Sequence, residues 1–311
     1  MKFELTILGC NSAVPTFDRF TTAQVLQVGH QIYLIDCGEG TQVRLGQFGI
    51  SKSKINQIFI SHLHGDHIFG LIGLLTSFSL RGREKPIDIF SPKGLQEMIE
   101  VQIKNSESHL SYPLNFHEVD TTVSKLVFED NLIEVYTIPL IHRVPTSGYL
   151  FREKQAPLNI RSEKITELNI PVEQIIKIKK GADFVMPDGT KVPHKDLVLA
   201  PMQPRSYAFC SDTVYNETII PIINRVDLLY HETTFLHEKL EKAVYTKHTT
   251  ALQAGMIAKA AEAGQLVTGH YSSRYDDVSP LIEEAKTVFP NTIAGSDGEK
   301  YEVLQKRSPE L

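Results

Sequence analysis

Short apolar or alternating runs, separated by turn-forming residues, recur along the first 140 residues and predict strands interspersed with helices. We expect strands at 2–8, 23–28, 31–35, 58–60, 87–90, 114–119, 125–128 and 132–138, and helices at 41–48, 68–80 and 94–104. The pattern returns near the carboxyl terminus, with strands expected at 206–209, 226–230, 266–270 and 301–304 and helices at 251–263 and 280–288. Helices placed between strands in this way are typical of an α/β fold.

Residues 152–200 interrupt this pattern, because they are mostly polar and contain several prolines and glycines. A connection of about 50 residues is far longer than the usual link between elements, so we interpret it as an arm inserted into a single domain spanning 1–311. Residues 154–195 hold eight Lys and Arg against five Asp and Glu, a net charge of +3, while the remainder carries 24 against 32, or −8. Lys177, Lys179 and Lys180 could therefore bind phosphate groups, although a solvated surface loop has the same composition.

The overall composition, 41% hydrophobic and 22% charged, is that of an ordinary soluble protein. The longest uncharged run, 68–80, is shorter than the ~20 residues that cross a bilayer, and the amino terminus alternates like a strand rather than a secretion signal. We therefore expect a cytoplasmic protein without a membrane segment. Its three cysteines are widely spaced and form no metal-binding pair, so they are expected to be reduced and buried.

The segment Ser61–His67 places three imidazoles and a carboxylate within six positions, although the whole chain contains only 12 histidines. It follows an apolar strand, so we expect a loop at the carboxyl end of that strand, where α/β sheets carry their sites. His62 and His64 can turn to one side, and Asp66 and His67 to another. Four ligands are too many for one catalytic zinc, which takes about three and keeps a position for water. This favours a two-metal centre completed by later residues.

Further imidazoles and carboxylates follow predicted strands at Asp36, His142, Asp212 and His270. Asp36 could support a metal-bound histidine, since such rings usually donate their second N–H to a carboxylate, or it could form an Asx-type turn. A histidine in the position of His142, taken alone, is more often a structural residue than a ligand. The residue pattern leaves these alternatives open.

The H-x-H-x-D-H loop, His142, Asp212 and His270 occur in the order found in the metallo-β-lactamase fold, which the chain resembles over nearly its whole length. This resemblance implies an αββα sandwich of two mixed sheets flanked by helices, here with an inserted arm. Within that superfamily the chain is similar to the ribonuclease Z family of tRNA 3′-processing endoribonucleases. The motifs that carry this likeness are SAVPT, LIDCGEGTQ, SHLHGDH, SDT, HETTF, KHTT and HYSSRY.

The resemblance implies two Zn²⁺ ions per subunit. His62, His64 and His142 would hold one ion, Asp66, His67 and His270 the other, and Asp212 would bridge them. It further implies Asp66 as general base and His248, oriented by Glu232, as the acid that protonates the leaving 3′ oxygen. Arg274 is interpreted as a phosphate contact, with a structural salt bridge as the alternative.

The implied activity is hydrolysis of precursor tRNA after the discriminator nucleotide, which leaves a 3′-hydroxyl on the tRNA. The implied assembly is a homodimer in which the arm of one subunit captures tRNA for the other. Val172-Glu173-Gln174 replaces the Gly-Pro pair usual in that arm. Alternative functions are another hydrolase of this fold, such as an arylsulfatase or a different phosphodiesterase, or a di-iron redox protein. The redox relatives usually carry an acidic residue at the position of His64 and an attached flavin domain.

Overall fold

The computed structural model describes residues 1–308. The chain divides into two compact units, which we call the body and the arm unit. The body comprises residues 1–152 and 206–303, and the arm unit comprises residues 153–205 together with the terminal residues from 304. Within the described part of the chain, no helix has the length and hydrophobicity needed to cross a lipid bilayer.

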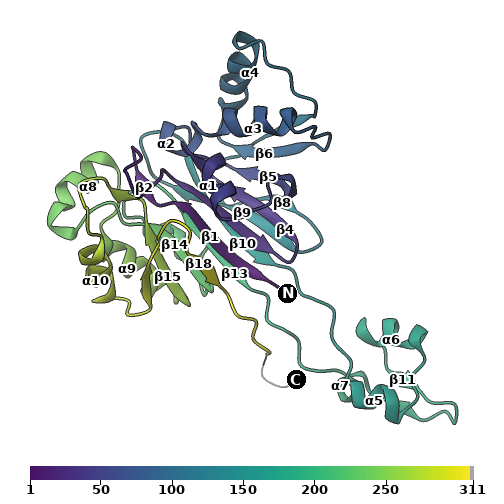
Figure 1. Cartoon of the computed structure of the whole chain (residues 1–311). Coiled ribbons are helices and arrows are strands. Elements are labelled where there is room, and N and C mark those ends of the chain that lie inside the picture. Colours follow the sequence, from purple (N-terminus) through teal and green to yellow (C-terminus); the bar gives the residue numbers. More distant parts are fainter. Residues whose placement is uncertain (309–311) are drawn as a thin grey trace. The chain divides into compact units, whose positions relative to one another are not determined.

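Two seven-stranded sheets form the centre of the body (Figure 1). The first sheet, in spatial order, consists of β18 (Lys300–Glu302), β1 (Phe3–Gly9), β3 (Ala23–Val28), β4 (Gln31–Ile35), β5 (Ile55–Phe59), β6 (Ile87–Ser91) and β7 (Leu114–Glu118). The second consists of β17 (Thr292–Ala294), β15 (Gln265–Gly269), β14 (Leu228–Glu232), β13 (Ser206–Cys210), β10 (Thr146–Glu153), β9 (Ile133–Leu140) and β8 (Leu126–Glu129). Both sheets mix parallel and antiparallel pairs, as expected from the sequence.

Helices cover the outer face of each sheet. Those associated with the first sheet are α1 (Thr41–Gln47), α2 (Gly65–Ile68), α3 (Leu71–Leu80) and α4 (Leu95–Asn105), with the short 3₁₀ helix η1 (Lys52–Lys54). Those associated with the second are α8 (Leu240–Thr246), α9 (Ala251–Ala260) and α10 (Ser279–Lys286), with η2 (Glu217–Ile219) and η3 (His237–Lys239). A small pair, β2 (Asn11–Ser12) and β16 (Tyr271–Ser272), lies apart from both sheets. The expected αββα arrangement is confirmed.

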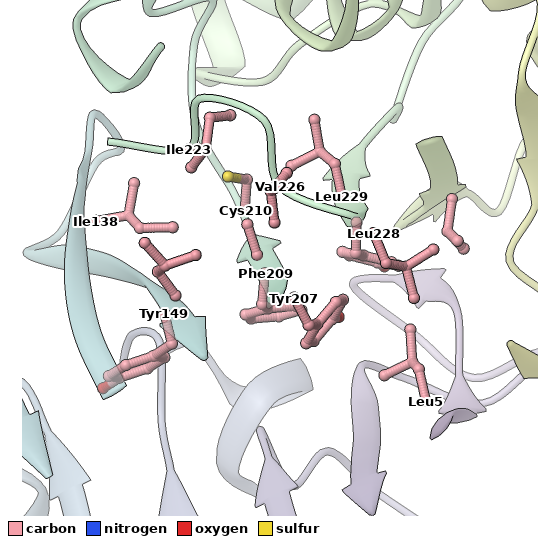
Figure 2. Close-up of a cluster of buried hydrophobic side chains, with 14 of the residues drawn as sticks. Leu5, Ile138, Tyr149, Tyr207, Phe209, Cys210, Ile223, Val226, Leu228 and Leu229 are labelled. Carbon is pink, nitrogen blue, oxygen red and sulfur yellow. The ribbon is translucent and has the colours of Figure 1, made fainter. Parts of the chain in front are cut away.

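The main hydrophobic core fills the space between the two sheets. Figure 2 shows Leu5 of the first sheet in the same buried cluster as Tyr149, Tyr207 and Phe209 of the second. Strands that face helices on one side and another sheet on the other are buried on both faces, which explains their continuous apolar runs. A second cluster packs α1, α3 and α4 against the first sheet.

The strand β10 was not predicted from the sequence, because Ser147 and Gly148 in its first half are residues typical of turns. The glycine is required by packing: a Cβ at Gly148 would lie 2.4 Å from the carbonyl oxygen of Phe209 in the neighbouring strand. β10 also supports the histidine-rich segment, because the Tyr149 hydroxyl donates to the Ile60 carbonyl at 2.7 Å. The Ser147 N–H donates to the Ser61 carbonyl at 3.0 Å.

The single helix predicted at 68–80 is wrong, since α2 and α3 are separate helices with a break at Phe69 and Gly70. A glycine is required at the break, because a Cβ at Gly70 would lie 2.1 Å from the Gly38 carbonyl oxygen. The helix expected from 251 is confirmed. Its N-cap is Thr250, which forms a reciprocal capping box with Gln253.

The arm unit contains regular structure that its polar composition did not predict. Its elements are α5 (Ser162–Glu167), α6 (Val172–Lys179), β11 (Phe184–Val185), β12 (Lys191–Val192) and α7 (His194–Leu197). They enclose a small core of their own, formed by Ile160, Ile170, Ile178, Phe184, Leu197 and Val198. At the base of the unit the buried Arg205 guanidinium binds the Glu153 carboxylate through Nε at 2.9 Å and Nη2 at 2.8 Å.

Candidate metal centre

The histidine-rich segment begins where β5 ends, as the sequence predicts, but only part of it is a loop. His62 and His64 lie in extended backbone, and His64 is the N-cap of α2. Asp66 and His67 lie within that four-residue helix, which corrects the expectation of a loop throughout. Asp66 and His67 belong to a different ligand group from His62 and His64, although the ring centres of His62 and His67 lie only 4.1 Å apart. The His67 carbonyl accepts a hydrogen bond from the Cys37 N–H at 2.7 Å, which joins α2 to the end of β4.

Four side chains from three separate segments bring their ligand atoms to one position. His64 Nδ1 lies 3.0 Å from His62 Nε2 and 3.3 Å from His142 Nε2. Asp212 Oδ2 lies 3.6 Å from His62 Nε2 and 3.7 Å from His142 Nε2. His142 follows β9 and Asp212 follows β13, so the ends of two strands of the second sheet contribute to this group. Three imidazole nitrogens and a carboxylate at this spacing form a group that could hold a metal ion.

A second group lies beside the first and consists of Asp66, His67 and His270. Asp66 Oδ2 is 3.5 Å from the Nε2 atoms of both histidines. The other oxygen of Asp212, Oδ1, faces the same two nitrogens, at 3.4 Å from His67 and 3.1 Å from His270. One oxygen of Asp212 therefore faces each group, which is the arrangement of a bridging carboxylate.

The second ring nitrogen of each of four histidines is occupied by a fixed partner. These contacts join His62 Nδ1 to Ser61 Oγ at 3.0 Å, His67 Nδ1 to Asp36 Oδ2 at 2.7 Å, His142 Nδ1 to the Lys247 carbonyl at 2.9 Å, and His270 Nδ1 to Thr234 Oγ1 at 3.0 Å. Partners of this kind orient a metal-binding ring and select its tautomer. They leave each Nε2 directed toward Asp212, and those of His67 and His270 also toward Asp66.

The residues fit a divalent cation on their own chemistry. His67 Nε2 and His270 Nε2 are buried and have no hydrogen-bond partner within residues 1–308. A buried nitrogen without a partner is costly, and a metal ion would satisfy both atoms. Imidazole and carboxylate ligands in groups of three and four suit zinc, with a position left for water.

Asp36 supports the centre, and the alternative of a simple Asx-type turn does not describe its contacts. The fully buried Asp36 carboxylate accepts the Ser61 N–H at 2.7 Å and the Ser61 hydroxyl at 2.8 Å, besides its contact with His67. The Asp36 backbone has a φ of 55°, an uncommon left-handed conformation for a residue other than glycine. The strand end is therefore shaped to direct this carboxylate toward the centre.

The electrostatic environment keeps three of the histidines and the bridging carboxylate in the forms that bind metal. Burial lowers the pKa values of His62, His64 and His142, so that these rings stay neutral with a free lone pair. Burial acts to raise the pKa of Asp212, but the surrounding histidines, His270 first, hold it well below its ordinary value. The bridging carboxylate is therefore ionised.

A carboxylate–imidazole pair, Glu232 and His248, lies next to the second group. Glu232 ends β14 fully buried, and its Oε1 lies 2.9 Å from His248 Nδ1 and accepts the Thr213 N–H at 2.9 Å. Its Oε2 accepts hydrogen bonds from the Thr234 N–H and hydroxyl, which also joins it to the partner of His270. Burial acts to lower the pKa of His248, but the charge and hydrogen bond of Glu232 raise it to about 9.

The expected substrate-binding residues lie in two places. Arg274 is exposed after β16, and its guanidinium donates to Ser272 Oγ at 3.3 Å. It forms no ion pair within the described residues, so the salt-bridge alternative has no support. Lys177 and Lys179 are in the last turn of α6 in the arm unit, and Lys180 is its C-cap; none of the three forms an ion pair among residues 1–308.

Two contacts to the site could not be anticipated from the sequence. The Ala13 N–H donates to Asp66 Oδ2 at 2.8 Å, and backbone groups carry no residue signature. Thr234 connects Glu232 to His270, and its only signal was its place within the HETTF motif. The first contact brings the residue after β2 against a metal ligand, and the second does the same for the segment after β14.

A protein-family model described as anti-Pycsar protein Apyc1 matches residues 3–156. Proteins named ribonuclease Z match far more of the chain. The one from Bacteroides thetaiotaomicron is 46% identical over 292 residues, which cover 94% of this chain and 92% of that protein. The one from Cytophaga hutchinsonii is 43% identical over 311 residues, covering 100% of this chain and 99% of that protein.

Solved structures give the same picture. The crystal structure of human tRNase Z, short form, superposes with a TM-score of 0.70 at 26% identity, covering 96% of this chain and 98% of that chain. The metallo-β-lactamase fold protein YhfI from Bacillus subtilis superposes with a TM-score of 0.68 at 20% identity, covering 97% of this chain and 100% of that chain. The expected fold, two mixed sheets flanked by helices, is therefore the metallo-β-lactamase fold.

Proposed function

Because this chain belongs to the ribonuclease Z family, we propose that it is a zinc-dependent endoribonuclease that removes the 3′ trailer of precursor tRNA. The chain is an endoribonuclease by its close similarity to these relatives over nearly its whole length. The observation that carries the finer proposal is the convergence of seven ligand side chains beside the Glu232–His248 pair.

Two zinc ions fit the donor set. His62, His64 and His142 would hold one ion, Asp66, His67 and His270 the other, and Asp212 would give one oxygen to each. Two such ions lower the pKa of a water molecule and stabilise the attacking and leaving oxygens of a phosphodiester. The same geometry gives no support to the di-iron redox alternative, because His64 occupies the position that is acidic in those proteins and its Nδ1 faces the other ligands.

We propose Asp66 as the general base. Its Oδ2 is held by the Ala13 N–H, and its side chain is 11% exposed at the edge of the site. Burial acts to raise the pKa of Asp66, but the neighbouring His67 and His270 lower it well below its ordinary value. The carboxylate is therefore ionised, and it can accept the proton that the attacking water loses as its oxygen bonds to phosphorus.

We propose His248 as the general acid. Its Nδ1 is held by Glu232, which leaves Nε2 to face the substrate, and its side chain is 14% exposed. When the bond between phosphorus and the 3′ oxygen breaks, the imidazolium can protonate that oxygen and become neutral. The products are a tRNA with a 3′-hydroxyl after the discriminator nucleotide and a trailer with a 5′-phosphate.

The arm unit and Arg274 would bind the tRNA. Three lysines, Lys177, Lys179 and Lys180, lie at the end of α6 in a unit that folds around its own small core. They therefore form a basic surface on a folded element rather than on an unstructured loop. In the arrangement we propose, this unit captures the tRNA for the active site of the other subunit in a homodimer. Exposed Arg274, with no carboxylate partner within residues 1–308, is a ready contact for a phosphate near the cut.

The match to the anti-Pycsar family offers a second candidate, another phosphodiesterase of this fold. That match ends at residue 156 and so excludes Asp212, Glu232, His248 and His270 as well as nearly all of the arm unit. The alignment with the ribonuclease Z of Cytophaga hutchinsonii covers 100% of this chain and therefore includes all of these segments. RNA is therefore the favoured substrate.

The decisive experiment incubates the purified, zinc-loaded protein with a precursor tRNA carrying labels at both ends. We expect a single cut after the discriminator nucleotide, with a 3′-hydroxyl on the tRNA fragment. A matched precursor that ends in an encoded CCA would report whether that trailer is accepted. Cleavage of a nitrophenyl phosphodiester without cleavage of any precursor tRNA would contradict the RNA assignment.

A further inference from the structure

A cleft of about 750 Å³ lies in the body, away from the metal ligands. The residues that line it are at the carboxyl ends of α1 and α3, and we call it the basic cleft. Its cations are Lys52, Lys54, Arg81, Arg83 and Lys85, and its one carboxylate is Glu84. The chain as a whole has a net charge of −5, so the positive charge of this cleft is opposite in sign to the net charge of the protein.

Four of these cations have no counter-ion. Lys52, Lys54, Arg81 and Lys85 form no ion pair with any carboxylate of residues 1–308, and this includes their neighbour Glu84. Burial and the nearby charge of Arg81 lower the pKa of Lys52, so two like charges are held close together. A bound anion would relieve this repulsion.

The position of the cations at helix carboxyl ends does not account for them. Basic side chains can stabilise a helix by binding its last carbonyl groups. Here backbone N–H groups bind those carbonyls: Phe48, Gly49 and Ile50 donate to the last turn of α1, and Arg81 and Gly82 donate to that of α3. Lys52 Nζ comes close to Gly46, since a Cβ at Gly46 would lie 3.9 Å from it. The Lys52 amine therefore lies beside the end of α1, within the cleft.

The side chain of Arg83, in one wall of the cleft, is fixed by several contacts. Its guanidinium donates to Asn56 Oδ1 at 2.7 Å and to the Lys85 and Pro86 carbonyls at 2.7 and 3.0 Å. It also lies over the rings of Phe78 and Tyr112, with its carbon 5.3 and 5.5 Å from their centres. Arg83 is held by these contacts, so Lys52, Lys54, Arg81 and Lys85 remain as the cations free to bind a ligand. Among them, Lys52 and Arg81 are the two whose charges act on each other.

The cleft and the metal centre belong to the same layer of the body. Both helices begin next to the metal-binding segment, where the Thr41 N–H donates to the Gly38 carbonyl and the Gly70 N–H donates to the Cys37 carbonyl. α1 and α3 are seven and ten residues long, so the cleft lies about 10–15 Å along the helices from α2. Figure 1 shows α1 and α3 on the outer side of the first sheet.

We propose that the basic cleft binds a backbone phosphate of the RNA substrate, outside the metal centre and through Lys52 and Arg81. This inference rests on the proposed function, since it takes the occupant to be the precursor tRNA itself. Phosphate groups attract unpaired cations without any need for a base sequence, and each contact releases counter-ions from the RNA. The contact would hold the RNA relative to the ions that cut it.

The test compares the zinc-loaded wild-type chain with Lys52→Glu/Arg81→Glu. The matched control is Lys125→Glu/Lys259→Glu, which makes the same charge change at exposed lysines outside the cleft. kcat/KM is measured for precursor tRNA over a range of salt concentrations and for a nitrophenyl phosphodiester at one concentration. We expect the cleft variant to lose about tenfold or more on precursor tRNA at low salt, with a shallower salt dependence, by about 0.7–0.9 in the logarithmic slope for each phosphate lost.

The small phosphodiester reports on the metal centre and on folding, and its turnover should stay at the wild-type value in all variants. If the charge reversal lowers it as well, the neutral pair Lys52→Gln/Arg81→Gln replaces the reversed pair and should show the same selective loss on RNA. Equal kcat/KM and equal salt slopes for wild type and cleft variant would overturn the proposal while leaving the ribonuclease assignment intact. A wild-type chain that cuts no precursor tRNA would instead remove the proposed function, and this inference with it.

Discussion

Asp36 Oδ2 lies 2.7 Å from His67 Nδ1, so a fully buried carboxylate fixes the ring of a residue placed to bind metal. The two residues come from different segments, the end of β4 and the helix α2. The contact orients His67 Nε2 toward Asp66 and Asp212, where it has no hydrogen-bond partner within residues 1–308. This contact connects the end of β4, in the first sheet, to a residue of the candidate metal centre.

Asp36→Asn should weaken zinc binding by about 10–100-fold, because the ring of His67 loses its ionised partner. The measurement is competition with a chelator of known zinc affinity. Asp88→Asn is the matched control, since Asp88 Oδ1 makes a similar 3.0 Å contact with His117 at an exposed site. Unchanged zinc affinity in Asp36→Asn would show that the pair does not support the metal.

His64→Ala should lose the ion of the first group, because His64 Nδ1 is the atom shared by the contacts to His62 and His142. Elemental analysis after gel filtration should fall from two zinc ions per chain toward one. His117→Ala, which removes an exposed imidazole, should retain both ions. Full occupancy in His64→Ala would exclude this residue as a ligand.

His248→Ala should keep both ions and lower kcat on precursor tRNA by about 10²–10⁴-fold, the usual contribution of a general acid. A nitrophenyl phosphodiester should be affected much less, since nitrophenolate leaves without being protonated. The ratio of the two rates thus separates acid catalysis from general damage to the site. An equal loss on both substrates would contradict the role of His248.

Glu232→Gln should move the alkaline limb of the kcat profile on precursor tRNA to lower pH. The imidazolium of His248 is stabilised by the anionic Glu232, which raises its pKa to about 9. Removing the negative charge lowers that pKa, so the protonated acid is lost at a lower pH. Profiles of wild type and variant between about pH 6 and 10 measure the shift, and an alkaline limb that does not move would be inconsistent with the pair.

Replacing residues 156–200 with a short Gly-Ser linker should abolish cutting of precursor tRNA but preserve turnover of a nitrophenyl phosphodiester. The deletion removes the whole small core of the arm unit and leaves the Glu153–Arg205 ion pair at its base. A narrower variant, Lys177→Ala/Lys179→Ala/Lys180→Ala, should raise KM for precursor tRNA with little change in kcat. Equal losses on both substrates would argue against a capture role.

Local patterns along the chain predicted most elements of the body, since strands buried on both faces and amphipathic helices leave strong signals. These patterns failed to predict elements whose structure depends on tertiary packing rather than on local composition. β10 was missed because Gly148 resembles a turn residue, yet the neighbouring strand requires a glycine there. The core of the arm unit was missed because its six apolar side chains are scattered over nearly 40 polar-rich positions, from Ile160 to Val198.

The sequence by itself determined which residue types the site would contain and after which strands they would stand, because strand ends and clustered histidines are local features. The tertiary structure decided which ring nitrogen each histidine presents, that Asp212 faces both groups with different oxygens, and that Asp36 supports His67. These relationships join segments up to about 200 positions apart, such as those of Asp66 and His270. They depend on the order in which distant strands pair, and no local pattern of residues encodes that order.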